Sequence, residues 1–210
     1  MQLLGIIGGI GSGKSTTSAL FRQCGAAVIN ADEIGHQVLR LPDVKKAVQE
    51  HWGSSVFDKN GDIDRRILAT VVFADENELA YLESLTHPLI VEEVQRQCNE
   101  HEQNGVQLCL LDAPVLLESG WDHKVDQIIF VSTPVEVRWH RIKKRGWSKA
   151  EWHQREAAQL PEEEKFRRAH IVLDNSGETE HLRIQVEEVV RGLKTVLLEN
   201  VPRHQFCENM

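Results

Sequence analysis

The stretch Gly8–Thr16, which reads GGIGSGKST, constrains this chain more than any other part of its sequence. It fits the Walker A pattern, in which a glycine is followed by four residues and then by Gly-Lys-Ser. An apolar run of strand length, Leu3–Ile7, precedes the stretch, and a segment with helical spacing, Lys14–Cys24, follows it. A strand, a glycine-rich loop and a helix in this order predict a loop whose backbone N–H groups surround a phosphate.

The residue types of this loop follow from that chemistry. Glycines let the backbone curl round phosphate oxygens without a Cβ clash. Lys14 is expected to hold the β- and γ-phosphates of a nucleotide, and the Ser15 hydroxyl is expected to bind Mg²⁺. We therefore assign nucleotide binding to the whole loop, which consists of Gly8, Gly9, Ile10, Gly11, Ser12, Gly13, Lys14, Ser15 and Thr16.

Further short apolar runs resemble the one before the loop, and segments of helical spacing separate them. Short strands that are apolar throughout are typical of a parallel sheet covered by helices on both faces. The chain is therefore expected to be an α/β protein. The runs are Leu3–Ile7, Ala27–Asn30, Leu108–Leu111, Gln127–Ser132 and Ile171–Leu173.

The connection between the second and third runs, about 37–104, is too long for a simple crossover. Arg65–Phe73 and Asn77–Leu85 are amphipathic, and Pro88 is expected to start a further helix through Cys98. These patterns predict an inserted helical subdomain. Asp58–Asp64 within it lacks the Gly and Glu of a calcium loop at the required positions, so we interpret it as a tight turn.

A second helical excursion covers about 138–168. Ser148 and Glu151 match a capping box that opens a helix through Ala158, and Pro161 is placed to start another helix. An amphipathic helix is expected over 179–199, followed by a polar, frayed tail.

Composition narrows the functional classes. Hydrophobic residues make up 41% of the chain and charged residues 27%, as in ordinary globular proteins, and no run approaches the roughly 18 apolar residues of a membrane span. The net charge of −8 argues against broad nucleic-acid binding, which depends on neutralising phosphates. Cysteines 24, 98, 109 and 207 lack the spacing of a zinc or redox motif. We expect a cytoplasmic protein that binds neither nucleic acid nor membrane.

The Walker A loop serves ATPases, GTPases and kinases alike, so other residues must narrow the class. The Asn-Lys-x-Asp of a GTPase is absent after the fourth run, which indicates ATP as the nucleotide. Asp32 follows the second run, where a carboxylate could take the proton of an acceptor hydroxyl. The alternative, a helix N-cap before Glu33, stays open. Asp112 ends the third run, where a carboxylate could hold Mg²⁺ or act only as a turn or cap residue.

Arg138, Arg141 and Arg145 fall at helical spacing on one face. Phosphoryl transfer needs positive groups that offset developing charge, and a mobile arm can supply them while it excludes water. In this acidic chain the cluster indicates a lid that closes on the nucleotide, rather than a merely solvated basic face. The combination of loop, carboxylate and basic helix is typical of a small phosphotransferase.

Taken together, these features resemble the dephospho-coenzyme A kinase family along nearly the whole chain. Two departures from the family pattern matter: Asn30 stands where the family has the first Asp of Asp-Ala-Asp, and His170 stands where it often has Asp. The segments that carry the resemblance beyond the loop are Asn30–Asp32, Asp64–Leu68, His87–Pro88, Asp112–Glu118, Arg141–Arg145, Arg155–Gln159, Glu164–Lys165 and Asp174–Gly177.

The resemblance implies a P-loop kinase fold with a five-stranded parallel sheet, a helical substrate-binding insertion and a helical lid. It also implies transfer of the γ-phosphate of ATP, with Mg²⁺, to the ribose 3′-hydroxyl of dephospho-coenzyme A. Asp32 would orient or deprotonate this hydroxyl, Lys14, Arg141 and Arg145 would act on the phosphates, and Asn175 would lie near the adenine. The further acceptor residues implied are Arg65, Arg66, His87, Pro114, Leu117 and Glu118. For His87 a purely structural role at the Pro88 helix entry stays open.

The chain is expected to divide into a core, an insertion, a lid and a tail. A nucleotide-binding core comprises 1–36, 106–137 and 169–199, the substrate insertion 37–105, the lid 138–168 and a flexible tail 200–210. Rival hypotheses are another small-molecule P-loop kinase for a nucleoside or nucleotide, and a regulatory nucleotide-binding protein. We expect a monomer or weak homo-oligomer whose partner is a small molecule.

Overall fold

The computed structural model of the protein describes residues 1–198. It divides into two compact units: Ala31–Gln97 forms one, and Met1–Asn30 together with the chain from Cys98 onward forms the other. We call them the helical unit and the core unit. The expected tail 200–210 lies outside the described residues. Within 1–198, no helix combines the length and apolar character needed to cross a membrane.

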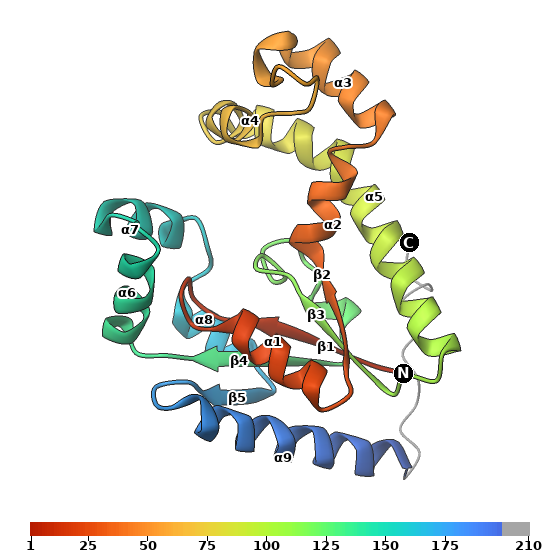
Figure 1. Ribbon diagram of the computed structural model, residues 1–210, viewed down its shortest axis with the longest axis vertical. Coiled ribbons are helices and arrows are strands. Elements are labelled where there is room, and N and C mark those ends of the chain that lie inside the picture. Colours follow the sequence, from red (N-terminus) through yellow and green to blue (C-terminus); the bar gives the residue numbers. More distant parts are fainter. Residues whose placement is uncertain (199–210) are drawn as a thin grey trace. The chain divides into compact units, whose positions relative to one another are not determined.

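A five-stranded sheet forms the centre of the core unit, with the strand order β2-β3-β1-β4-β5 (Figure 1). All neighbouring strands are parallel, which confirms the expected sheet. Each strand begins and ends within one residue of its apolar run. The strands are β1 (Gln2–Ile7), β2 (Ala27–Asn30), β3 (Leu108–Asp112), β4 (Gln127–Ser132) and β5 (Ile171–Asp174).

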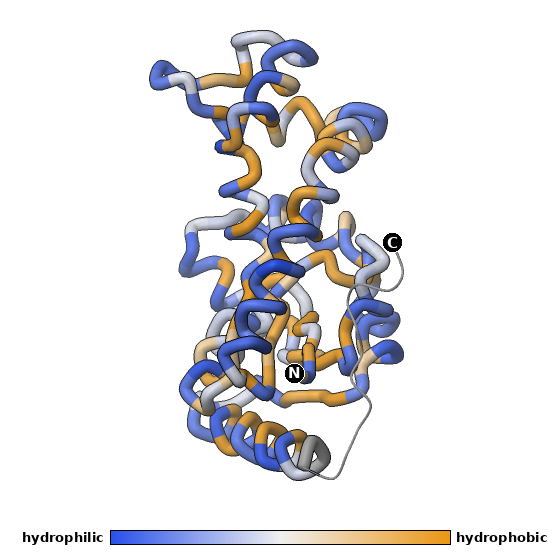
Figure 2. The backbone as a smooth tube through the Cα atoms, turned by 90° about the vertical axis from the view of Figure 1, so that its right-hand side faces the viewer, coloured by the Kyte–Doolittle hydropathy of each residue, from blue (hydrophilic) through white to orange (hydrophobic). Residues whose placement is uncertain are grey.

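One face of this sheet is covered by α1 (Lys14–Gln23) and α9 (Thr179–Leu198), which bury Leu4 and Ile6 of β1 beneath Phe21 and Val186. Hydrophobic and hydrophilic residues alternate round α9 (Figure 2), as expected for a helix with one face on a core.

The other face of the sheet lies under the segment after β3 and under α8 (Glu162–Arg168). A Cβ on Gly5 of β1 would contact Leu116 and Val125, so this strand needs glycine for close packing. Phe166 of α8 contacts Phe130 of β4 edge to face. The remaining helices of the core unit are α6 (Val135–Lys144) and α7 (Lys149–Ala157), and the capping box of Ser148 with Glu151 is confirmed at the start of α7.

The helical unit contains α2 (Ala31–Val38), α3 (Pro42–Trp52), α4 (Arg65–Val72) and most of α5 (Glu76–Gln103). His51 of α3 stacks on Tyr81 of α5, and Trp52 Nε1 donates to Glu78 at 2.6 Å. The tight turn is confirmed, because Asp58 Oδ1 accepts the N–H groups of Asn60 and Asp62. The short 3₁₀ turns of the protein are η1 (Ser54–Val56) and η2 (Asp122–Lys124).

The predicted helix break at Pro88 is wrong, because α5 is one helix of 28 residues with Pro88 inside it. Proline lacks the N–H that would bond to the Ser84 carbonyl, at a cost of about 3 kcal/mol. Tertiary packing offsets that cost, since Thr86 before the proline and Val94 after it are both buried. The interpretation of His87 as the residue that fixes a helix entry is wrong for the same reason.

The contrast between two residues of α9 tests this packing. Leu182 is fully buried in the core cluster, whereas Ile184 is 44% exposed. Leu182→Ala is expected to lower the free energy of unfolding by about 2–5 kcal/mol, because it leaves a cavity under the sheet. Urea unfolding would measure the loss. Ile184→Ala is the matched control, with a loss below about 1 kcal/mol; equal losses would contradict the packing described.

Candidate nucleotide-binding site

The glycine-rich loop leaves the carboxyl end of the central strand β1 and enters α1. Gly11 and Gly13 have φ of 85° and 98°, a conformation that side chains with a Cβ rarely adopt. Gly13 directly precedes α1, so the unpaired N–H groups of the first helical turn face the loop. Lys14 Nζ donates to the carbonyls of Gly8 at 2.8 Å and Gly9 at 3.4 Å, which holds the ammonium over the loop backbone.

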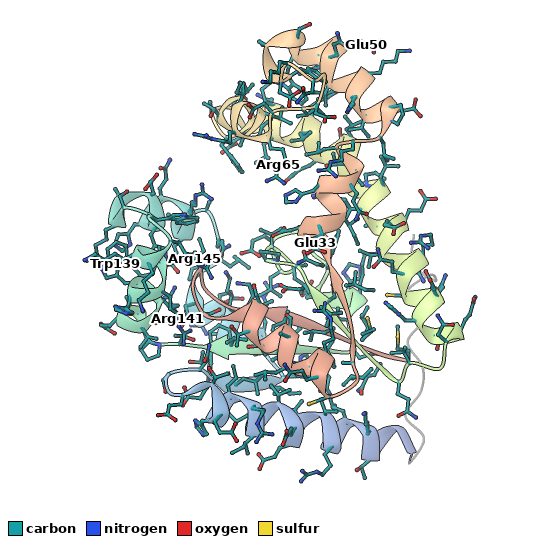
Figure 3. All side chains as sticks on the ribbon, in the orientation of Figure 1. Glu33, Glu50, Arg65, Trp139, Arg141 and Arg145 are labelled. Atoms are coloured by element: carbon teal, nitrogen blue, oxygen red, sulfur yellow. The ribbon has the colours of Figure 1, made fainter. Side chains whose placement is uncertain are left out.

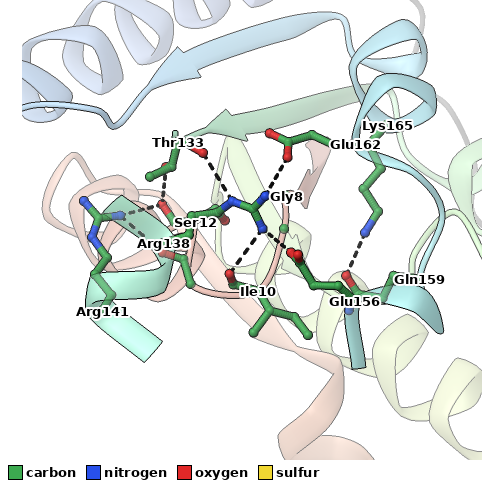
Figure 4. Close-up of polar contacts among 12 residues, drawn as sticks. Gly8, Ile10, Ser12, Thr133, Arg138, Arg141, Glu156, Gln159, Glu162 and Lys165 are labelled. Atoms are coloured by element: carbon green, nitrogen blue, oxygen red, sulfur yellow. Dashed lines mark hydrogen bonds and ion pairs between the residues drawn. The ribbon is translucent and has the colours of Figure 1, made fainter. Parts of the chain in front are cut away.

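The carbonyl oxygen of Ser12 accepts three side-chain hydrogen bonds (Figure 4 shows two of them). The donors are Thr133 Oγ1 at 2.8 Å, Arg141 Nη1 at 3.0 Å and Asn175 Nδ2 at 2.6 Å. In a trans peptide the C=O and the following N–H point in opposite directions. The Gly13 N–H is therefore turned away from these donors, and its direction is fixed by side chains outside the loop.

Arg141 belongs to α6 and is half-buried against the loop (Figure 3). It also donates to the carbonyls of Gly11 at 3.3 Å and Asn175 at 3.1 Å. Burial lowers the pKa of Arg141, and the neighbouring charge of Arg145 lowers it further. A guanidinium stays charged at neutral pH even so. An anion beside Arg141 and Arg145 would be attracted by both positive charges.

Asp112 is the last residue of β3 and is 8% exposed. Its Oδ2 accepts a hydrogen bond from the Ser18 hydroxyl of α1 at 3.0 Å. The sheet register pairs Asp112 with Ile6 of β1 and with Asn30 of β2. The carboxylate therefore lies at the carboxyl edge of the sheet, beside the strand that leads into the loop.

Arg138, which the sequence groups with Arg141 and Arg145 on one face of a helix, is not a solvated cation. Arg138 is 3% exposed and forms ion pairs with Glu156 of α7 and Glu162 of α8. A guanidinium can be buried only when carboxylates or carbonyls compensate it. Spacing along one helix could not reveal partners that come from two other helices.

Glu118, a predicted acceptor residue, contacts the connection between α7 and α8. Its Oε1 accepts the Leu160 N–H at 2.8 Å and lies 3.6 Å from Lys165 Nζ. Lys165 is 2% exposed and also donates to Gln159 Oε1 at 2.8 Å. Burial lowers the pKa of Lys165, and the Glu118 carboxylate partly offsets this. Of the other predicted acceptor residues after β3, Pro114 is half-buried and Leu117 is buried.

In the helical unit, Asp32 lies within the first turn of α2, which begins at Ala31, so the N-cap interpretation is wrong. His36 follows one turn later. Partial burial lowers the pKa of His36, the charge of Arg65 lowers it further, and the charge of Asp32 raises it. Asp32 and Arg65 thus both act electrostatically on His36; Arg65 is labelled in Figure 3. His36 was not predicted from the sequence, although its spacing of four from Asp32 was a signal.

Arg66 follows Arg65 in the first turn of α4 and is exposed, and His87 is half-buried within α5. A cavity of about 470 Å³ also lies in the helical unit, lined by residues of α3 and the following turns, including Lys45, Ser54 and Phe57. None of the predicted acceptor residues lines this cavity.

A profile of the dephospho-CoA kinase family matches residues 2–181. The chain belongs to the dephospho-CoA kinase family. A dephospho-CoA kinase of Symbiobacterium thermophilum is 40% identical over 195 residues, which cover 91% of this chain and 81% of the relative. A dephospho-CoA kinase of Aquifex aeolicus is 37% identical over 194 residues, which cover 92% of this chain and 98% of the relative.

Solved structures agree with this membership. A Thermus thermophilus crystal structure has a TM-score of 0.75 at 35% identity and covers 96% of this chain and 98% of its own. A dephospho-CoA kinase of Campylobacter jejuni has a TM-score of 0.71 at 25% identity and covers 94% of this chain and 100% of its own. A shikimate kinase of Acinetobacter baumannii has a TM-score of 0.51 at 12% identity, and this likeness shows the shared P-loop kinase fold alone. Membership of a kinase family implies ATP as co-substrate of this dephospho-CoA kinase homologue.

The Ser12 carbonyl offers an isosteric test of the loop. Thr133→Val keeps the shape of a buried side chain but removes the hydroxyl that donates to Ser12. A hydrogen bond worth about 1 kcal/mol then no longer favours the binding conformation of the loop. The Kd for ATP, measured by calorimetric titration, is expected to rise about three- to tenfold. Thr133→Ser keeps the hydroxyl and is the control; equal weakening in both variants would contradict the role of this bond.

Proposed function

We propose that the protein transfers the γ-phosphate of ATP to the ribose 3′-hydroxyl of dephospho-coenzyme A, giving coenzyme A and ADP in the cytoplasm. The observation that carries the proposal is the family match over residues 2–181, which includes the loop, the helical unit and the basic helix α6. The relatives of Symbiobacterium thermophilum and Aquifex aeolicus, at 40% and 37% identity with this chain, support it.

On the donor side, the loop residues Gly8–Thr16 hold the triphosphate through backbone N–H groups and the end of α1. Lys14 binds the β- and γ-phosphates, and Arg141 and Arg145 offset the charge that develops as the phosphoryl group moves. The contacts of Arg141 with the loop carbonyls of Gly11 and Ser12 support this role, because they hold the guanidinium beside the phosphate-binding backbone. Asn175, which donates to Ser12, contacts the nucleotide on its adenine side.

The donor side also suits Mg²⁺. The Ser15 hydroxyl is exposed in the first turn of α1, and the Asp112 carboxylate ends β3; both are hard oxygen ligands. Mg²⁺ takes few protein ligands and the rest from phosphates and water. We propose that Ser15 and Asp112 hold the ion, directly or through water. When bound, Mg²⁺ would neutralise phosphate charge.

On the acceptor side, Asp32 orients the 3′-hydroxyl and takes its proton as the hydroxyl oxygen attacks the γ-phosphorus. Asp32 follows Asn30 by two residues, and Asn30 is the residue of β2 registered with Asp112. Two residues span about 7 Å at most, so the chain itself tethers Asp32 to the carboxyl end of β2.

The acceptor requires more contacts than a simple alcohol because it carries a nucleotide and a long tail. We assign its binding to the predicted acceptor residues and propose that 138–168 acts as the lid. Arg65 influences the same His36 as Asp32 does, which supports a role of Arg65 near the base. The proposed acceptor residues are Asp32, Arg65, Arg66, His87, Pro114, Leu117 and Glu118.

The substrate assignment is tested by a coupled assay of ADP release with a panel of acceptors. Dephospho-coenzyme A is expected to raise ADP release far above the buffer rate, whereas nucleosides, nucleotides and shikimate are not. If another nucleoside raised the rate and dephospho-coenzyme A did not, the protein would be a different small-molecule kinase.

The base is tested by Asp32→Asn, which keeps the size of the side chain and removes its proton affinity. We expect kcat to fall about 10²-fold or more, with little change in the Kd for ATP. Glu33→Gln removes the adjacent carboxylate of the same helical turn and is the control, with kcat within about threefold of the parent. Unchanged turnover in Asp32→Asn would make Asp32 a structural residue only.

A further inference from the structure

Arg138 is the most deeply buried guanidinium beside the loop, and it contacts four separate elements (Figure 4). Its Nε donates to the Thr133 carbonyl after β4 at 3.2 Å, and its Nη1 lies 3.5 Å from the Ile10 carbonyl of the loop. Nη1 also pairs with Glu156 of α7, and Nη2 donates to Glu162 of α8 at 2.8 Å. One side chain thus joins the loop, β4, α7 and α8.

The position of Glu156 makes this network electrically important. A Cβ built on Gly9 would lie 3.2 Å from Glu156 Oε1 and would also meet the Arg138 guanidinium. A carboxylate is therefore held directly against the backbone of the phosphate-binding loop. Without a cation beside it, this carboxylate would repel the triphosphate that the loop is built to hold.

Packing alone would not require a charge at this place. Trp152 of α7 is fully buried, stacks on Trp139 of α6 and lies under the guanidinium, whose Cζ is 5.4 Å from the ring centroid. An apolar side chain at 138 could fill the same space. It could not donate to the Thr133 carbonyl or compensate the two carboxylates, which the planar fork of an arginine does together.

We propose that Arg138 is a positioning residue for the donor nucleotide: it neutralises Glu156 beside the loop and fixes the loop to α7 and α8. The triphosphate then meets the cationic side chains of Lys14 and Arg141 and no uncompensated carboxylate. This inference rests on ATP being the donor in the proposed function.

The experiment is direct titration of ATP without any acceptor, by calorimetry at low and moderate salt. Arg138→Gln exposes the loop to the charge of Glu156, so the Kd for ATP is expected to rise at least tenfold, and less at the higher salt. The double variant Arg138→Gln with Glu156→Gln removes both charges and is expected to return the Kd to within about threefold of the parent. This recovery is a readout that a merely structural role would not produce.

Arg183→Gln is the matched control. Arg183 is also held by two glutamates, Glu180 and Glu187, but all three lie on α9 away from the loop. Its loss should leave the Kd for ATP unchanged.

The proposal is overturned if Arg138→Gln binds ATP like the parent, or if the double variant is as weak as the single one. If Arg138→Gln does not fold, the single variant Glu156→Gln tests the proposal. Its Kd for ATP should stay within twofold of the parent value or fall, and a rise above threefold contradicts the proposal. A parent protein that binds ATP but does not phosphorylate dephospho-coenzyme A would instead count against the proposed function.

Discussion

The conformation of the phosphate-binding loop depends on one peptide carbonyl, that of Ser12. Three hydrogen bonds reach it from the end of β4, from α6 and from the residue after β5. These donors are separated from Ser12 by more than a hundred residues, so the loop takes its shape only when the sheet has formed in the order β2-β3-β1-β4-β5. A loop fixed in this way meets a triphosphate with little reorganisation, which is what electrostatic catalysis of phosphoryl transfer requires.

Much of this was predictable because the signals are local. Each strand is a short apolar run with turn residues at its ends, and burial on both faces of a parallel sheet demands that composition. The Walker A spacing indicated the place of the loop, since side chains with a Cβ rarely adopt the φ of Gly13. The capping box of Ser148 with Glu151 is equally local and was equally clear.

Other features depend on contacts that no local pattern encodes. Pro88 is a helix breaker by propensity, yet α5 continues through it because residues on both sides are packed in the interior. Arg138 has the spacing of a basic surface, yet its partners Glu156 and Glu162 lie on other helices. Thr133 follows a strand at the carboxyl edge of the sheet, which was a usable signal, but its hydroxyl gains a role only because Ser12 comes within reach.

The loop is prepared for ATP, and we propose that a carboxylate base, Asp32, tethered by the chain to the end of β2, acts on an alcohol. The proposed reaction is defined by the atom that receives the phosphate. The most direct measurement is to incubate the protein with ATP, Mg²⁺ and dephospho-coenzyme A and to locate the new phosphate by ³¹P NMR of the purified product. A phosphomonoester on the ribose 3′-oxygen and an equal amount of ADP are expected. Phosphate on another oxygen of the acceptor, or ADP accompanied only by inorganic phosphate, would contradict the proposed reaction.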